Sequence, residues 1–67
     1  METLADALPK EQERVRELIP IYESVGPAGA FALAMIKCSL LNAERAAACG
    51  DVVAMARALE DLRSYDA

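Results

Sequence analysis

Apolar residues recur at helical spacing along the whole chain, and glycine and proline divide this pattern into three segments. The first segment, residues 9–25, begins near Pro9 and is expected to form an amphipathic helix. Pro20 lies inside it on the polar side, so we expect a bend there and no break. The apolar stripe of this segment comprises Leu8, Val15, Leu18, Ile19, Tyr22 and Val25.

The second segment, residues 27–49, is apolar nearly all round, a pattern typical of a helix covered on several sides. Lys37 and Glu44 form its one narrow charged stripe. One large apolar face comprises Phe31, Met35, Cys38, Leu41 and Cys49, and a second comprises Leu33, Ile36 and Leu40. The face of small residues between them comprises Ala28, Ala32, Ser39, Ala43 and Ala46.

The third segment, residues 52–64, follows Gly50, which is expected to end the preceding helix in a left-handed conformation. Asp51 is a good N-cap residue for it. Its expected inner stripe comprises Val52, Met55, Ala56, Leu59 and Leu62. The pattern therefore predicts one all-α domain over residues 1–67, a three-helix bundle or a helical hairpin with a long central helix.

A chain of 67 residues has a small core, and such proteins often need a disulfide, a metal or a partner chain for stability. The two outer helices offer one stripe each, so part of the central helix is expected to remain exposed. An apolar surface of this kind usually marks a binding surface, most commonly between two identical chains. A closed monomeric bundle is the alternative. The expected interface comprises Phe31, Ala32, Leu33, Met35, Ile36, Leu40 and Ala43.

The chain has no histidine and two cysteines, Cys38 and Cys49. Eleven residues along one helix separate them by about 16 Å, too far for a disulfide between them. We expect two buried free thiols, as in a reducing cytoplasm, while a bridge between chains stays open. No spacing indicates a metal site or a cofactor.

The net charge of −4 disfavours binding to a nucleic-acid backbone. We expect no signal peptide, because the first residues lack a basic stretch before an apolar run. Residues 25–43 are apolar, but Lys37 and the neighbouring polar residues disfavour a membrane span. We expect no enzyme, because three short helices hardly enclose a cleft of about 300 Å³. Lys37 and Glu44 either face water or pair across an interface between chains and fix its register.

Three stretches of the sequence, residues 8–14, 26–31 and 50–55, resemble a family of small prophage-associated proteins of proteobacteria. The resemblance covers nearly the whole chain after residue 8. It implies a prophage origin and a cytoplasmic setting, and it carries over no catalytic residue.

These features together predict an interaction module that forms a homo-oligomer, most simply a dimer. The alternative is a small acidic inhibitor or regulator that binds a host protein through an apolar helix face.

Overall fold

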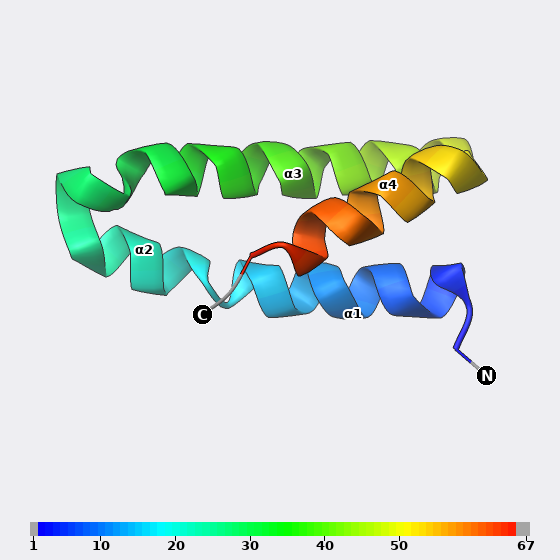
Figure 1. Cartoon of the computed structure of the whole chain (residues 1–67), viewed down its shortest axis with the longest axis horizontal. Helices are drawn as coiled ribbons and strands as arrows, with labels where there is room; N and C mark the ends of the chain where they lie inside the picture. Colours follow the sequence, from blue (N-terminus) through cyan, green and yellow to red (C-terminus); the bar gives the residue numbers. More distant parts are fainter. Residues whose placement is uncertain (1, 66–67) are drawn as a thin grey trace.

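A computed structural model describes residues 2–65, which form four α-helices and one short 3₁₀ helix and no strand. The helices are α1 (Leu4–Arg16), α2 (Ile19–Val25), η1 (Gly26–Gly29), α3 (Ala30–Cys49) and α4 (Val52–Arg63). Helices α1 and α2 run along one side of a hairpin, α3 returns along the other, and α4 crosses between α1 and α3 (Figure 1). The predicted all-α class is confirmed, with a helical hairpin as its main feature.

Helix α1 begins five residues before the predicted start at Pro9. Thr3 caps it: the Thr3 hydroxyl accepts from the backbone N–H of Asp6, and the Asp6 carboxylate accepts from the backbone N–H of Thr3. This capping box satisfies donors that a helix start otherwise leaves free. The hydrogen bonds from Thr3 also hold the pKa of Asp6 below its ordinary value. Pro9 therefore lies inside the helix, on its exposed side.

The chain bends before Pro20, but the helix is interrupted there, where a bend without a break was predicted. Helix α1 ends at Arg16, a turn follows at Glu17 and Leu18, and α2 starts at Ile19. Proline has no N–H to donate to the carbonyl four residues earlier, and it disfavours helical geometry in the residue before it. Pro20 instead occupies the first turn of α2, where no such donor is needed.

The hairpin turn is made by η1, so the α-helical part of the central segment begins at Ala30 and not at Pro27. Gly29 allows the close approach of this turn to α2, since a Cβ atom there would lie 2.6 Å from the backbone oxygen of Tyr22. From Ala30 the helix continues without a break to Cys49. Gly50 ends it with φ 68°, and Asp51 caps α4, as predicted.

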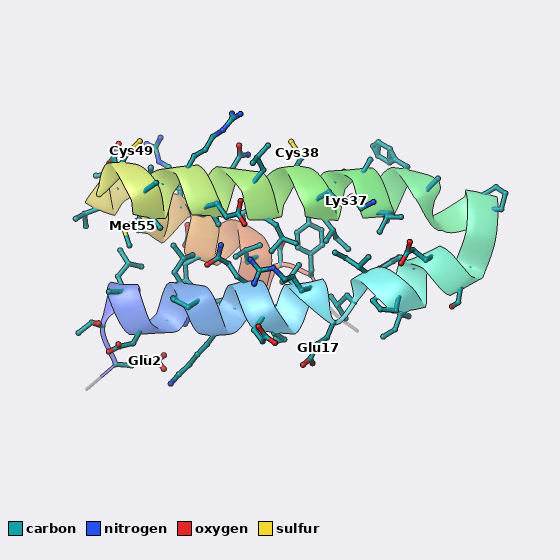
Figure 2. All side chains as sticks on the ribbon, turned by 180° about the vertical axis from the view of Figure 1, so that it is seen from behind. Glu2, Glu17, Lys37, Cys38, Cys49 and Met55 are labelled. Atoms are coloured by element: carbon teal, nitrogen blue, oxygen red, sulfur yellow. The ribbon has the colours of Figure 1, made fainter. Side chains whose placement is uncertain are left out.

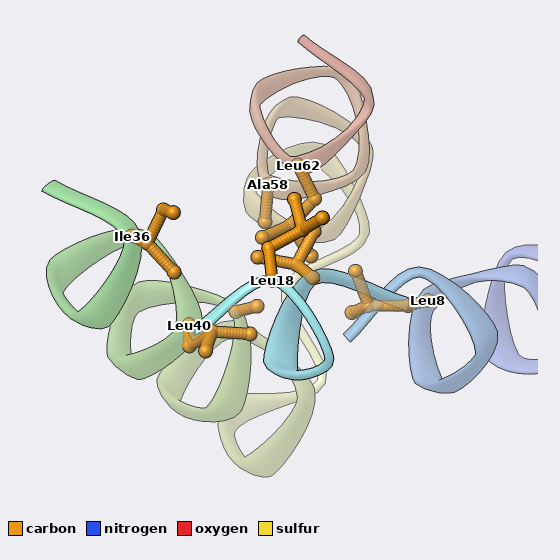
Figure 3. Close-up of a cluster of buried hydrophobic side chains, with 8 residues drawn as sticks. Leu8, Leu18, Ile36, Leu40, Ala58 and Leu62 are labelled. Atoms are coloured by element: carbon orange, nitrogen blue, oxygen red, sulfur yellow. The ribbon is translucent and has the colours of Figure 1, made fainter. Parts of the chain in front are cut away.

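The core lies where α1, α3 and α4 meet. In Figure 3 the side chains of Leu8, Leu18, Ile36, Leu40 and Leu62 gather between the three helices. The remaining buried members are small or β-branched: Val15, Ala43 and Ala58. Two stripes differ from the prediction, since Val25 on α2 and Val52 and Ala56 on α4 are exposed, while Ala58 faces inward.

Arg14 joins α1 to the end of α4. Its Nη1 and Nη2 atoms donate to the backbone oxygens of Tyr65 and Leu62, each at 2.9 Å, and its Nε donates to Oε2 of Glu11 at 2.9 Å. The last carbonyls of a helix have no partner within the helix, and a cation there also interacts favourably with the helix dipole. The Tyr65 hydroxyl shares a hydrogen bond of 2.9 Å with the Ser39 hydroxyl on α3. These bonds connect the three packed helices at one point.

The molecule is long and thin for its mass. It measures 37 × 22 × 15 Å, with a radius of gyration of 12.2 Å, whereas a compact domain of this length has about 11 Å. Its accessible surface is 4493 Å², against about 4,100 Å² for a typical monomer of its mass. A thickness of 15 Å leaves one side of each helix without a neighbour.

We predict that Arg14→Met lowers the free energy of unfolding by about 2 kcal/mol, because it removes two charge-assisted hydrogen bonds to the end of α4. Chemical denaturation followed by circular dichroism measures this loss. Arg16→Met is the matched control, since Arg16 makes only exposed ion pairs at 3.5 and 4.0 Å and its loss costs less than about 0.5 kcal/mol. Equal effects of the two substitutions would contradict the role of Arg14.

Candidate interaction surface

The side of α3 that points away from α1 and α4 is apolar and exposed. Phe31 is 72% exposed, Met35 48% and Leu41 45%. Figure 2 shows Cys38 and Cys49 on the edge of α3 that faces away from α1. None of these side chains packs into the core, so the hairpin leaves this apolar side of the helix uncovered.

A seven-residue repeat runs along this exposed side. Phe31, Cys38 and Arg45 are seven residues apart, and Ala34, Leu41 and Ala48 follow each of them by three residues. All six are exposed, and we call them the outer seam. Spacings of three and four in alternation place side chains in the stripe through which two helices pack as a coiled coil. The seam therefore has the pattern of a helix-pairing surface, with Arg45 as its one charged member.

Two different flanks border the outer seam. The charged flank consists of Lys37 and Glu44, and the neutral flank consists of Met35, Asn42 and Cys49. Glu44 accepts a long hydrogen bond of 3.5 Å from Nη2 of Arg16 on α1. Lys37 makes no ion pair within residues 2–65. Both flanking charges are exposed, so both can interact with a partner chain.

The structure places the seven predicted interface residues in three groups. Phe31 is exposed and lies in the outer seam, and Met35 is exposed and lies beside it. Ala32 and Leu33 are half-buried. Ile36, Leu40 and Ala43 are buried in the core of a single chain. The prediction that Ile36, Leu40 and Ala43 lie at an interface is therefore wrong, because α1 and α4 already cover them and leave no surface for a second chain.

The reason for this correction is the size of the side chains on α3. Helices approach closely where side chains are small, and α4 and α1 pack against the face that contains Ser39, Ala43 and Ala46. Ile36 and Leu40 border that face and are buried with it. The spacing of three and four does not by itself distinguish the opposite face, because Leu33, Ile36, Leu40 and Ala43 on the inner side follow it too. The exposure of Phe31 and Leu41 distinguishes the two faces.

The prediction that both thiols are buried is also wrong, because Cys38 and Cys49 are free and exposed. Neither bridges the other, as their spacing predicted. Their exposure follows from their position on or beside the side of α3 that no other helix among residues 2–65 covers. Cys38 lies within the outer seam, so its thiol reports directly on what covers that seam.

A groove of about 540 Å³ lies between the last turns of α3 and one side of α4, from Asp51 to Asp61. It is larger than the cleft that the number of helices led us to expect. Arg45 and Arg57 line it together with Asp51 and Asp61, so its charges are balanced. Among residues 2–65 no group of three metal-binding side chains occurs. The Cys49 thiol also lines this groove.

One window of 18 residues between Leu4 and Cys49 has a mean hydropathy of 1.5 and is long and apolar enough to cross a membrane by length and composition alone. Only 22% of that window is buried. A membrane is therefore one of the environments that could cover the exposed side of α3, together with a second copy or another protein.

Comparisons with protein-family models, curated proteins and solved structures found no match to this chain. The resemblance to a family of prophage-associated proteins stays a prediction.

Proposed function

We propose that this chain is a self-associating helical module that forms a homodimer through the outer seam of α3. The observation that carries the proposal is a coiled-coil spacing on the side of α3 that the other helices leave exposed. Burial of Phe31 and Leu41 against a second copy would remove two of the three large exposed apolar side chains of α3 from water.

The charges on α3 favour a second copy over a membrane as the occupant. Helix α3 has 20 residues and a length of about 30 Å, which matches a bilayer. However, Lys37 lies near its middle, and Glu44 and Arg45 lie further along. Each such charge costs a few kcal/mol inside a membrane, whereas Lys37 and Glu44, which lie beside a helix-pairing seam, stay in water.

We also propose a prophage setting and a reducing, cytoplasmic compartment. The support for the first is the resemblance of residues 8–14, 26–31 and 50–55. The support for the second is the pair of free, exposed thiols, since a reducing compartment keeps such thiols from bridging at random. In this setting the dimer acts by presenting its remaining surface to other proteins rather than by catalysis.

We predict that Leu41→Glu raises the dimer dissociation constant at least about a hundredfold. The substitution removes a seam leucine from each copy and places a carboxylate there instead; burial of one leucine contributes about 1.5–3 kcal/mol. Light scattering coupled to size-exclusion chromatography over a concentration series measures the mass. Ile21→Glu is the matched control, because Ile21 is 53% exposed on α2, away from the outer seam. This substitution should leave the dimer intact.

Three results would contradict the proposal. The unchanged chain could have the mass of a monomer at its highest soluble concentration. Leu41→Glu and Ile21→Glu could shift the mass equally, which would remove the outer seam from the interface. Finally, a monomeric chain could co-sediment with lipid vesicles through Leu41, which would make a membrane the occupant.

A further inference from the structure

We infer that the two copies pack α3 against α3 in antiparallel directions. The twofold axis crosses the outer seam at the level along α3 that is midway between Ser39 and Leu40. This inference rests on the proposed homodimer and adds its orientation and register. It follows from the order of charges and side-chain sizes along the outer seam and its flanks.

The seam residues match in size in this register. Positions equally distant from the axis face each other, so Phe31 meets Ala48 of the second copy, Cys38 meets Leu41, and Ala34 meets Arg45. A large side chain faces a small one at every level, as close packing of two helices requires. Opposite an alanine, Arg45 can lay its aliphatic part along the seam and extend its guanidinium into water.

The charged flank selects the antiparallel direction. In an antiparallel pair this flank meets the same flank of the second copy, which places Lys37 beside Glu44 twice per dimer. In a parallel pair it would meet the neutral flank, and Lys37 would face Asn42 while Glu44 faced Cys49. A parallel pair would also place Arg45 against Arg45 inside the seam, two like charges at close distance.

The same charges select one register among the antiparallel ones. A shift by seven residues in one direction places Lys37 beside Lys37 of the second copy. The opposite shift places Glu44 beside Glu44. Only the register centred between Ser39 and Leu40 pairs unlike charges, and both shifted registers also shorten the overlap of the two helices. Lys37 and Glu44 thus act as the register-setting charges of this dimer.

The two natural cysteines test the direction. In the inferred register the Cys38 residues of the two copies are three residues apart along the axis, about 4.5 Å, while the Cys49 residues are about 28 Å apart. We expect a short bis-maleimide reagent to link Cys49→Ser chains, which retain Cys38, into a covalent dimer on a denaturing gel. It should leave Cys38→Ser chains, which retain Cys49, unlinked.

The reaction is run at a concentration where light scattering gives the mass of a dimer, so a failure of self-association is seen separately. Efficient linking through Cys49 would overturn the antiparallel direction, because only a parallel pair brings these thiols together. A dimer that links through neither cysteine would overturn the assignment of the outer seam.

Charge exchange tests the register. We expect Lys37→Glu and Glu44→Lys each to weaken the dimer about tenfold, since each replaces two attractive contacts per dimer with two repulsive ones. The double variant exchanges both charges and should restore the dissociation constant to within about threefold of the unchanged chain. Sedimentation equilibrium measures these constants.

Two controls separate this effect from others. Lys10→Glu makes the same change in net charge on the exposed surface of α1 and should leave the dimer unchanged. Arg16→Gln removes the contact of Glu44 within the chain and should also leave it unchanged. A double variant as weak as either single variant would overturn the pairing of Lys37 with Glu44.

Discussion

Helix α3 is apolar on almost every side, and the helices that pack on it among residues 2–65, namely α1, α2 and α4, leave its outer side uncovered. Helices α1 and α4 each have a single apolar stripe, and both pack on adjoining sides of α3, where serine and alanine allow close approach. Ile36 and Leu40 are buried there, while Phe31 and Leu41 on the opposite side are not. The thin, elongated shape of the molecule and its exposed outer seam both follow from this shortage of neighbours.

The same shortage connects folding with association. The core consists of a few aliphatic side chains, and one cluster of polar bonds around Arg14 holds the end of α4 against α1. Small cores of this kind contribute only about 3–5 kcal/mol. A partner that binds only the folded chain adds to this stability by mass action. In the proposed dimer, the outer seam would therefore stabilise the fold as well as the assembly, and the charged flank would favour one arrangement.

The sequence predicted the class and the main boundaries well where local signals are strong, such as the capping residues Gly50 and Asp51. It failed at Pro20, where the cost of a missing backbone donor depends on whether the chain can start a new helix nearby. It also assigned Ile36 to an interface and predicted that Cys38 is buried. Helical periodicity defines the faces of a helix but not which neighbour covers each face. That choice depends on how closely two helices approach, a property of the pair.

The reactivity of the Cys38 thiol as a function of protein concentration tests the central claim most directly. In the Cys49→Ser chain, Cys38 is the only thiol and lies in the outer seam. The rate constant of its reaction with a chromogenic disulfide should be high in dilute solution and should fall as the concentration passes the dissociation constant of the dimer. A rate constant that stays the same while the mass rises from monomer to dimer would show that the chains associate elsewhere.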